Sequence, residues 1–430
     1  MEAGRSSGGA ATLLAAVLAA AGLAQAWELG RRSAGSDFYQ FWMVAGVIGR
    51  SDVPSVYDEE AHARLGSEFI RRSFTDDVSE RRRRAAREWQ VLQPTATPLL
   101  YSAFRPLTGL GYEHAHLLFR TVSLAAVAAA LVAITLLVGH SAATALLAVA
   151  FVTLAFHPLK ASIQVGNVSE LQLAAIAGYL WLSAGPDAAR RQVAAGGLLG
   201  ALVLIKPNLI GVPLLLAAVW ITRRRRRKLK LQAAGVVAGA IAGLLFSALV
   251  FASLTPWRDW LEYLAAFPPE NIPLRLGNLG LARIVFDTTG LRVSPVLAAV
   301  ALGVALTAVW AGRARGTEPS AQDSSRAAVE DTVGLAAGVF VYLLSAPLVW
   351  DHYLLLALPG ALVLLREANE PGRGGAVRRG LAGLALILLA IDPLKSLLNL
   401  YDMYAQAALT VAGLLVLYTL TVRELARPRS

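Results

Sequence analysis

Long, nearly uncharged apolar runs recur along the chain from Ala10 to Val422, and no other feature limits the possible folds so strongly. Hydrophobic residue types make up 56% of the sequence, and the runs are continuous rather than alternating. Continuous runs rich in Leu, Ala, Val and Gly are typical of helices buried in lipid and in one another, whereas a membrane β-barrel is built of short alternating strands. The sequence therefore predicts an all-α, polytopic transmembrane helical bundle that forms a single domain over residues 1–430.

The apolar runs predict about twelve helices, several of them shorter than the roughly 20 residues that a full crossing needs. The first run resembles a signal peptide in length, but no small-residue cleavage site follows it, so we interpret it as a retained helix. The predicted spans are Ala10–Trp27, His116–Val138, Ala142–Phe156, Val168–Ser183, Val193–Ile205, Pro207–Ile221, Gln232–Leu254, Val293–Trp310, Val333–Leu348, Tyr353–Leu365, Leu381–Ile391 and Gln406–Val422.

The basic residues indicate how the helices are oriented. The net charge of +11 is concentrated in short loops, and seven of the eight residues in the strongest cluster, Arg223–Lys230, are basic. Such loops face the cytoplasm, which places both termini inside and two long segments, 28–93 and 255–292, outside. This clustering is typical of a topology signal that touches anionic lipid, and it does not predict a nucleic-acid-binding surface.

Two segments leave the number of crossings open. Val193–Ile221 is interrupted by Lys206, so its two arms form either a hairpin or one long helix with the lysine inside it. Thr95–Leu110 either crosses the membrane or dips into it and returns. We favour the hairpin and the dip, because only then do Arg190 and Arg191 stay on the cytoplasmic side.

The first outer segment, residues 28–93, is rich in aromatic and charged residues. Phe38, Tyr39, Phe41 and Trp42 predict an amphipathic helix in the membrane interface, where aromatic rings with one polar edge are common. A charged, helix-like run follows over residues 59–89. This segment is therefore predicted to contain interfacial helices.

Several classes of site are excluded or unsupported by composition. The sequence contains no cysteine, which rules out disulfides, thiolate metal sites and a cysteine nucleophile. The histidines His62, His114, His116, His140 and His157 have no spacing typical of metal ligands. We therefore assign no metal and no cofactor.

Asp37 is the first candidate for a catalytic residue. It follows Gly35 and Ser36 at the outer edge of the first predicted span. Desolvation at this position raises the pKa of a carboxylate unless a cation balances it, and such a group can act as a general base toward a hydroxyl. The alternative is a helix N-cap before Phe38, which is a common role for aspartate.

Lys206 is the candidate for binding a phosphate. It interrupts a long apolar stretch and is followed by Pro207. Ionisable groups in such positions are costly and commonly functional, and a lysine holds a phosphate as a point charge. The alternative is a lysine at the tip of a hairpin whose ammonium group reaches the lipid headgroups. Arg275, in the second outer segment, either joins Lys206 around the phosphate or anchors its loop to lipid.

The residues from Trp350 to Tyr353 form the candidate sugar site. His352 offers a hydrogen-bond donor, Trp350 offers a surface on which a pyranose ring can stack, and Tyr353 adds a hydroxyl. The alternative is an aromatic belt with a solvated Asp351.

Amide side chains at three further positions complete the candidate site. Gln164 and Asn167 suit sugar hydroxyls, although they are equally compatible with an ordinary turn. Asn278 is assigned to the same sugar or acceptor site, with contact to the phosphate or simple anchoring of its loop as alternatives.

These motifs together resemble glycosyltransferase family 87, and their order along the chain is more specific than any one of them. The resemblance runs from about Asp37 to Tyr353. The chain departs from the family pattern at Thr95–Thr97, which separate two prolines, at Asn278–Leu281, and at a single His352 where a pair is common. The motifs that carry the resemblance are Ser36-Asp37-Phe38-Tyr39, Gln93-Pro94-Thr95-Ala96-Thr97-Pro98-Leu99-Leu100, Gln164-Val165-Gly166-Asn167, Ile205-Lys206-Pro207, and Ser345-Ala346-Pro347 with Trp350-Asp351-His352-Tyr353.

The resemblance implies a GT-C membrane enzyme on the outer face of a bacterial plasma membrane. Such an enzyme takes a sugar, typically mannose, from a polyprenyl-phosphate donor and passes it to a glycolipid or glycan acceptor. It implies that the donor phosphate lies near Lys206 and Arg275, that the sugar lies against Trp350 and His352, and that Asp37 deprotonates the acceptor. The configuration of the anomeric carbon is then inverted.

Two other functions fit the same composition. A transporter or flippase for a lipid-linked sugar would also be polytopic, basic and aromatic at its edges, although no internal repeat of the kind found in transporters is evident. An inactive subunit of the same fold is the other alternative.

Overall fold

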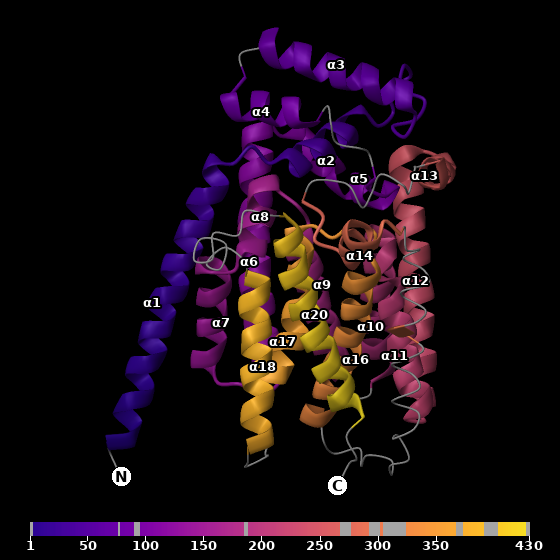
Figure 1. The fold of residues 1–430 in the computed structure, drawn as a ribbon. Helices are drawn as coiled ribbons and strands as arrows, with labels where there is room; N and C mark the ends of the chain where they lie inside the picture. The colour runs from indigo at the N-terminus through magenta and orange to yellow at the C-terminus, as the bar shows by residue number, and fades with distance from the viewer. Residues whose placement is uncertain are drawn as a thin grey trace.

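Figure 1 shows the computed structural model, which describes residues 3–75, 78–89, 95–184, 188–266, 277–291, 302–303, 324–366, 373–390 and 403–426. All regular structure in these ranges is helical, and no strand occurs in them, which confirms the all-α fold class. The start of α1 (Ala3–Arg32) and the end of α20 (Met403–Leu425) lie at the same end of the molecule (Figure 1). The GT-C type and the count of twelve spans stay predictions.

Five helices among the described residues are long and apolar enough to cross a membrane. They are α1, α6 (Tyr112–Leu137), α12 (Arg226–Phe251), α16 (Ser324–Ser345) and α20. A further candidate span is the pair α7 (Ala142–Leu154) and α8 (His157–Val165), whose axes differ by 59°. Pro158 stands in the first turn of α8, where proline starts a helix but cannot continue one, so the break falls here.

Shorter helices account for most of the other predicted spans. The predicted span Val293–Trp310 lies outside the described residues, apart from residues 302–303. The shorter elements are α9 (Ser169–Ala184), α10 (Ala189–Ile205), η2 (Pro207–Ile210), α11 (Gly211–Thr222), η4 (Asp351–Ala357), α17 (Leu358–Leu365) and α18 (Arg373–Ala390).

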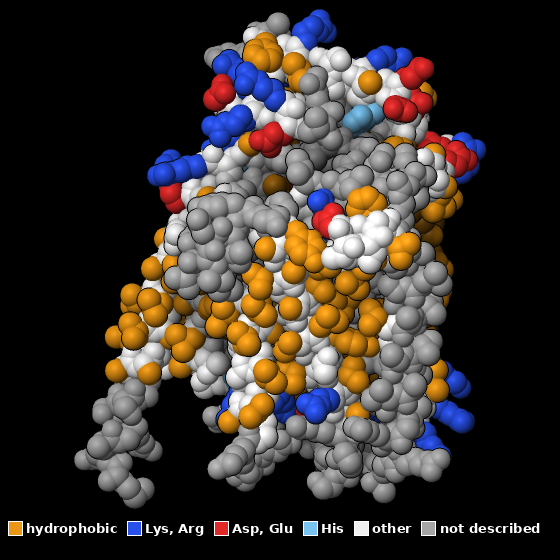
Figure 2. Space-filling view, viewed as in Figure 1, with side chains coloured by type: hydrophobic (Ala, Val, Ile, Leu, Met, Phe, Trp, Pro, Cys, Tyr) orange, Lys and Arg blue, Asp and Glu red, His pale blue; other side chains and the backbone are white. Residues whose placement is uncertain are grey.

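The helix α16 forms the centre of the bundle, because 94% of its apolar window is buried. It packs against α9, α11, α17 and α20. The helices α1 and α12 lie at the periphery, with only 22% and 17% of their windows buried, and Leu249 of α12 is 81% exposed. Figure 2 shows apolar side chains spread over this part of the surface. Exposed apolar helix faces of this extent are suited to contact with lipid.

Glycines allow α10 and α12 to pack backbone against backbone. A Cβ atom on Gly196 would lie 2.1 Å from the carbonyl oxygen of Gln232, and one on Gly200 would lie 2.2 Å from that of Val236. Gly235 and Gly239 repeat the same four-residue spacing on α12. This pattern of small residues is a common way for membrane helices to associate closely.

The segment that contains Lys206 is a helical hairpin, as predicted. The start of α10 and the end of α11 lie at one end of the bundle, where Gln192 is hydrogen-bonded to α12 and Arg223 contacts Glu330 at 3.3 Å. Lys206 lies at the other end, within electrostatic range of Asp37. The chain therefore turns back at Lys206.

The segment 95–110 begins and ends on the same side of the bundle and does not cross it, and its dip into a membrane stays a prediction. It forms the short helix α5 (Pro98–Phe104) and the 3-10 helix η1 (Arg105–Gly109). At its start the indole of Trp260 donates to the carbonyl of Thr95 at 3.1 Å, and at its end the indole of Trp42 donates to the carbonyl of Leu107 at 3.1 Å. Both ends are thus tied to elements on the same side of the molecule.

That side carries a cap of short helices above the bundle (Figure 1). We call it the crown, and it consists of α2 (Ser36–Val47), α3 (Glu59–Thr75), α4 (Glu80–Trp89), α5 and α13 (Thr255–Ala266). We expected Phe38, Tyr39 and Phe41 to lie at a membrane interface, but they are buried, at 0%, 0% and 5% exposure. The reason is that α5 and α6 cover these rings: Phe38 and Phe41 pack against Phe104 of α5, and Tyr39 packs against Tyr112 of α6.

Candidate active site

Asp37 stands in the first turn of α2 without acting as its cap. The N-cap residue is Gly35, and no side chain caps the helix. The carboxylate of Asp37 instead accepts a hydrogen bond of 2.7 Å from the side-chain amide of Asn167. The structure therefore excludes the N-cap alternative and leaves the carboxylate turned toward a residue on a distant part of the chain.

Asn167 is itself held in one orientation. Its Oδ1 accepts a hydrogen bond of 2.9 Å from the hydroxyl of Ser169, which leaves its Nδ2 to donate to Asp37. The turn before it is joined to the turn before Asp37, because the amide of Gly35 donates to the carbonyl of Gln164 at 3.1 Å. The side chain of Gln164 is exposed, and the residue contributes to this turn through its backbone carbonyl.

Two glycines make this close approach possible. Gly35 and Gly166 have φ values of 72° and 70°, in the left-handed region that favours glycine. A Cβ atom on Gly166 would lie 2.7 Å from Cβ of Phe38, and one on Gly35 would lie 2.6 Å from Nε2 of His116. Both glycines were visible in the sequence, but their pairing depends on the packing of α2 against α8.

The surroundings of Asp37 adjust its acidity to near neutrality. The helix α2 lies outside the candidate spans, and Asp37 is partly buried. Burial raises the pKa of Asp37 to about 6, although the hydrogen bond from Asn167 and the positive charge of Lys206 lower it, while the charge of Glu88 on α4 raises it further. A carboxylate with this pKa is ionised at pH 7 and can still accept a proton.

Lys206 lies at the tip of the hairpin between α10 and η2, over an aromatic surface. Its Nζ is 3.1 Å from the centroid of the Tyr353 ring and 5.6 Å from that of Tyr342. No described carboxylate lies within ion-pair distance of this ammonium group. Because π faces stabilise the cation without using its N–H groups as an ion pair would, Lys206 keeps donors for an anionic ligand.

The side chains of the segment from Trp350 to Tyr353 contact different parts of the molecule. Tyr353 lies under Lys206, whereas Asp351 turns to the other side, where its carboxylate is 3.8 Å from Nε2 of His157. The His352 ring is nearly buried, at 7% exposure, and meets the Tyr353 ring edge to face at 4.7 Å. His352 is also within electrostatic range of Lys206. Lys206, His352 and Tyr353 therefore form one cluster.

Trp350 and Asn278 belong to a neighbouring junction of two loops. Asn278 is 1% exposed, donates to the carbonyl of Pro347 at 2.9 Å, and accepts from the amides of Gly280 and Val349 at 2.9 and 3.0 Å. Its amide thus holds the two loops together, a structural use that the sequence did not reveal. Trp350 packs against Gly277, where a Cβ atom would lie 2.6 Å from the ring. Arg275 lies outside the described residues.

Two residues that the sequence analysis did not single out also face Asp37. Tyr101 of α5 is fully buried and lies within electrostatic range of the carboxylate. Glu88 of α4 approaches from the crown. The only signal for Tyr101 was its place just after the motif around Pro98. No group of three or more potential metal-ligating residues occurs in the described part of the chain.

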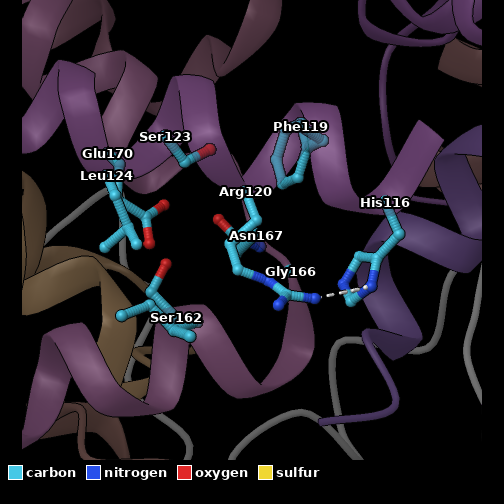
Figure 3. Close-up of a pocket in the computed structure, with 10 residues that line it drawn as sticks. His116, Phe119, Arg120, Ser123, Leu124, Ser162, Gly166, Asn167 and Glu170 are labelled. Atoms are coloured by element: carbon cyan, nitrogen blue, oxygen red, sulfur yellow. Dashed lines mark hydrogen bonds between the residues drawn. The ribbon is translucent and has the colours of Figure 1, made fainter. Parts of the chain in front are cut away.

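A small cavity adjoins Asn167 (Figure 3). Gly166 and Asn167 line it from the loop between α8 and α9, and His116 and Arg120 line it from α6. The loop that donates a hydrogen bond to Asp37 through Asn167 therefore also forms part of the cavity wall.

The comparisons with known proteins give one match. The model of glycosyltransferase family 87 matches residues 95–347, which is more than half of the chain. No curated protein and no solved structure matches it. The matched residues include Asn167 and Lys206 and thus two of the segments that build the site around Asp37. On this evidence the chain belongs to glycosyltransferase family 87.

Proposed function

We propose that this glycosyltransferase moves a hexose, with mannose as the first candidate, from a polyprenyl-phosphate donor to a hydroxyl group of a glycolipid or glycan acceptor. The observation that carries the proposal is that Asp37 and Lys206 lie within electrostatic range of each other. One is a partly buried carboxylate, and the other is an amine without an ion-pair partner among the described residues. An acid–base group and an anion-binding group are the two elements that transfer from a sugar phosphate requires.

In the proposed reaction Asp37 acts as the general base. Its carboxylate accepts the proton of the acceptor hydroxyl while the hydroxyl oxygen forms a bond to the anomeric carbon of the sugar. The bond between that carbon and the phosphate oxygen breaks, and its electron pair leaves with the polyprenyl phosphate. Because attack and departure occur on opposite faces of the carbon, the configuration is inverted.

Lys206 stabilises the leaving phosphate in this scheme. The ammonium group is already held over Tyr353 and Tyr342, so little reorganisation is needed when the charge on the phosphate grows. Arg275 is proposed as a second cation for the phosphate on sequence grounds alone. Tyr353 thereby supports the lysine, in addition to the contact with the sugar that the sequence suggested.

The sugar and the acceptor are assigned to the remaining candidates. His352 and Trp350 are proposed to contact the hexose, because His352 belongs to the Lys206 cluster and Trp350 immediately precedes η4. Gln164 is proposed for the acceptor, since its side chain is exposed on the loop that precedes Asn167. We leave Asn278 out of the proposed site, because its amide is engaged with the backbone of two loops.

The proposed location is the outer face of the bacterial plasma membrane. The basic cluster that begins at Arg223 lies at the end of the bundle opposite Asp37, where Arg223 and Arg225 contact Glu330 and Lys228 contacts Asp331. If the basic end is cytoplasmic, as the positive-inside rule predicts, the site faces the extracytoplasmic side.

The proposal is tested with purified protein in liposomes. Radiolabelled polyprenyl-phosphate mannose is added together with a panel of glycolipid and glycan acceptors, and labelled product is separated from the donor. We expect product with the wild-type protein and none with Asp37→Asn. Because the bend at Pro158 and the break at Lys206 are also features of transporters, movement of the intact donor across the liposome is measured in parallel. Movement without transfer would reject the enzyme.

A further inference from the structure

A tyrosine of α6 holds the short link that precedes Asp37. The chain passes from α1 to α2 through only three residues, 33–35. The hydroxyl of Tyr112, the first residue of α6, donates a hydrogen bond of 2.6 Å to the carbonyl oxygen of Ala34 in this link. The link is therefore fixed to α6 at a point three residues before the carboxylate.

The ring of Tyr112 also packs against α2 itself. It meets the rings of Tyr39 and Trp42 edge to face, with centroids 5.5 and 5.6 Å away, and the ring of Phe38 at 5.8 Å. Tyr112 is only 3% exposed, so its ring and its hydroxyl are both enclosed by protein. One side chain thus contacts the chain just before and just after Asp37.

The same link is held a second time from α8. The amide of Gly35 donates to the carbonyl of Gln164 at 3.1 Å, and the carbonyl of Gly35 accepts from the amide of Tyr39 at 2.8 Å in the first turn of α2. The ring of His116 stacks on that of Tyr112, with centroids 5.7 Å apart and an interplanar angle of 6°, and its Nε2 faces Gly35. The link therefore lies between α6 and α8, with contacts to both.

The hydrogen bond from Tyr112 satisfies a carbonyl that has little access to water. Ala34 is 9% exposed. A buried carbonyl that loses its donor keeps its desolvation cost, and the chain relieves that cost by moving the carbonyl toward water. Such a movement would displace Gly35 and, with it, the start of α2.

We propose that Tyr112 is a positioning residue for the base, because its hydroxyl fixes the link before α2 at the place where Asp37 reaches the amide of Asn167. Asn167 approaches from the α8–α9 loop, so the bond of 2.7 Å forms only if α2 starts at the correct position relative to that loop. Tyr112 acts through the backbone of α2 in this scheme and touches neither the donor nor the acceptor. The inference rests on the proposed role of Asp37 as the base.

Tyr112→Phe tests the hydroxyl alone, because the phenylalanine ring keeps the aromatic contacts with α2. A misplacement of about 1 Å at a reacting group can lower a rate about 100-fold. The remaining ring contacts limit the movement, so we expect kcat to fall about 10-fold. The groups proposed to bind the donor, Lys206 and Tyr353, lie on other elements. The KM for the donor and the affinity for polyprenyl phosphate should therefore stay within about twofold of the wild-type values.

Tyr418→Phe is the matched control. The hydroxyl of Tyr418 in α20 also donates to a backbone carbonyl, that of Leu302, at 2.9 Å, and the residue is 9% exposed. It lies about two helical turns before Leu425, whose carbonyl accepts from Arg223 at the end of the bundle opposite Asp37. This substitution removes the same kind of bond far from the site. It should lower Tm and leave kcat and KM unchanged.

Difference infrared spectroscopy follows the carboxylate without any transfer activity. Asp37→Asn identifies the carboxylate stretching band, and Asn167→Ala gives the position of the band when the hydrogen bond from the amide is absent. Tyr112→Phe should move the band in the same direction as Asn167→Ala, whereas Tyr418→Phe should leave it in place. Circular dichroism confirms that the compared variants have the same helical content.

Two results would overturn the inference. One is a band for Asp37 that stays at its wild-type position in Tyr112→Phe, whatever happens to kcat or Tm, because the hydroxyl then does not place the carboxylate. The other is an equal displacement of the band in Tyr418→Phe, which would trace the effect to general stability. If the band moves in Tyr112→Phe alone while transfer is absent or unchanged, the positioning role stands and the proposed role of Asp37 fails.

Discussion

Asn167 donates a hydrogen bond of 2.7 Å to Asp37 although the two residues are 130 positions apart in the chain. This contact joins α2 to the loop after the bent helix pair α7 and α8. It leaves one carboxylate oxygen bonded and the carboxylate as a whole partly accessible. A general base needs this combination of a fixed orientation and an open face.

Asp37→Asn should reduce transfer by about 100-fold or more, because removal of a general base typically costs 10²–10⁴ in rate. The amide keeps the size of the side chain, so donor binding and helical content should stay close to those of the wild-type protein. The measurement is the initial rate with saturating donor. Asp52→Asn is the matched control, since Asp52 lies in the same outer segment but pairs with Arg50. Near-normal turnover by Asp37→Asn would remove this residue from the mechanism.

The rate of transfer should rise with pH through about 6 and level off above it. The proposed base is the ionised carboxylate of Asp37, and its pKa of about 6 means that this form is lost as the pH falls through that value. Lys206→Met should move this limb to higher pH, because the positive charge of Lys206 lowers the pKa of Asp37. The pH–rate profile of the wild-type protein tests the position of the limb, and the profile of the remaining activity of Lys206→Met tests its displacement. A limb near pH 4 would show that the carboxylate is not desolvated.

Asp37→Asn should stabilise the protein relative to wild type more strongly at alkaline pH than at acidic pH. The folded pKa of about 6 lies above the ordinary value of 3.8, so the wild-type protein loses stability as the pH rises through this interval. The amide does not ionise and avoids the loss. Thermal unfolding of both proteins at pH 4 and pH 8 gives the comparison. An equal difference in Tm at the two pH values would contradict the raised pKa.

Lys206→Met should weaken binding of polyprenyl phosphate by about 10- to 100-fold, which is the usual effect of losing a hydrogen bond to a charged group. Tyr353→Leu should have a smaller effect of about 1 kcal/mol, roughly fivefold, because it removes the aromatic support and not the cation. The affinity for polyprenyl phosphate without a sugar measures both. If Tyr353→Leu is as damaging as Lys206→Met, the aromatic contact has a more direct role in binding the donor.

Gly166→Ala should reduce transfer, whereas Gly139→Ala should not. Both glycines have left-handed φ values, of 70° and 93°, so each substitution should cost about 1 kcal/mol of stability from the backbone alone. Only at Gly166 would the new Cβ meet a neighbour, Phe38, at 2.7 Å, while the space around Gly139 is open within 4 Å. Thermal unfolding and transfer rates of the two variants separate backbone strain from displacement of α2. Equal activities would show that the α2–α8 contact tolerates movement.

Several features followed from the sequence because they depend on neighbouring residues. The apolar runs predicted helices, and the break at Lys206 predicted a hairpin that the structure contains. The same local patterns did not show what each side chain would contact. Phe38 and Tyr39 had the composition of an interfacial helix, yet aromatic rings of α5 and α6 bury them. Asn278 had the chemistry of a sugar ligand, yet its amide holds two loops.

The sequence by itself determined the helical membrane fold and singled out Asp37, Lys206 and His352 as candidates, because apolar runs and isolated polar residues within them are properties of short segments. Only the tertiary structure decided which of these groups meet. The bond from Asn167 to Asp37, the ring of Tyr353 under Lys206, and the shared cavity of Arg120 and Glu170 each join distant elements. Such contacts depend on how helices pack, and close approaches at Gly35 and Gly166 set that packing to within a single methyl group.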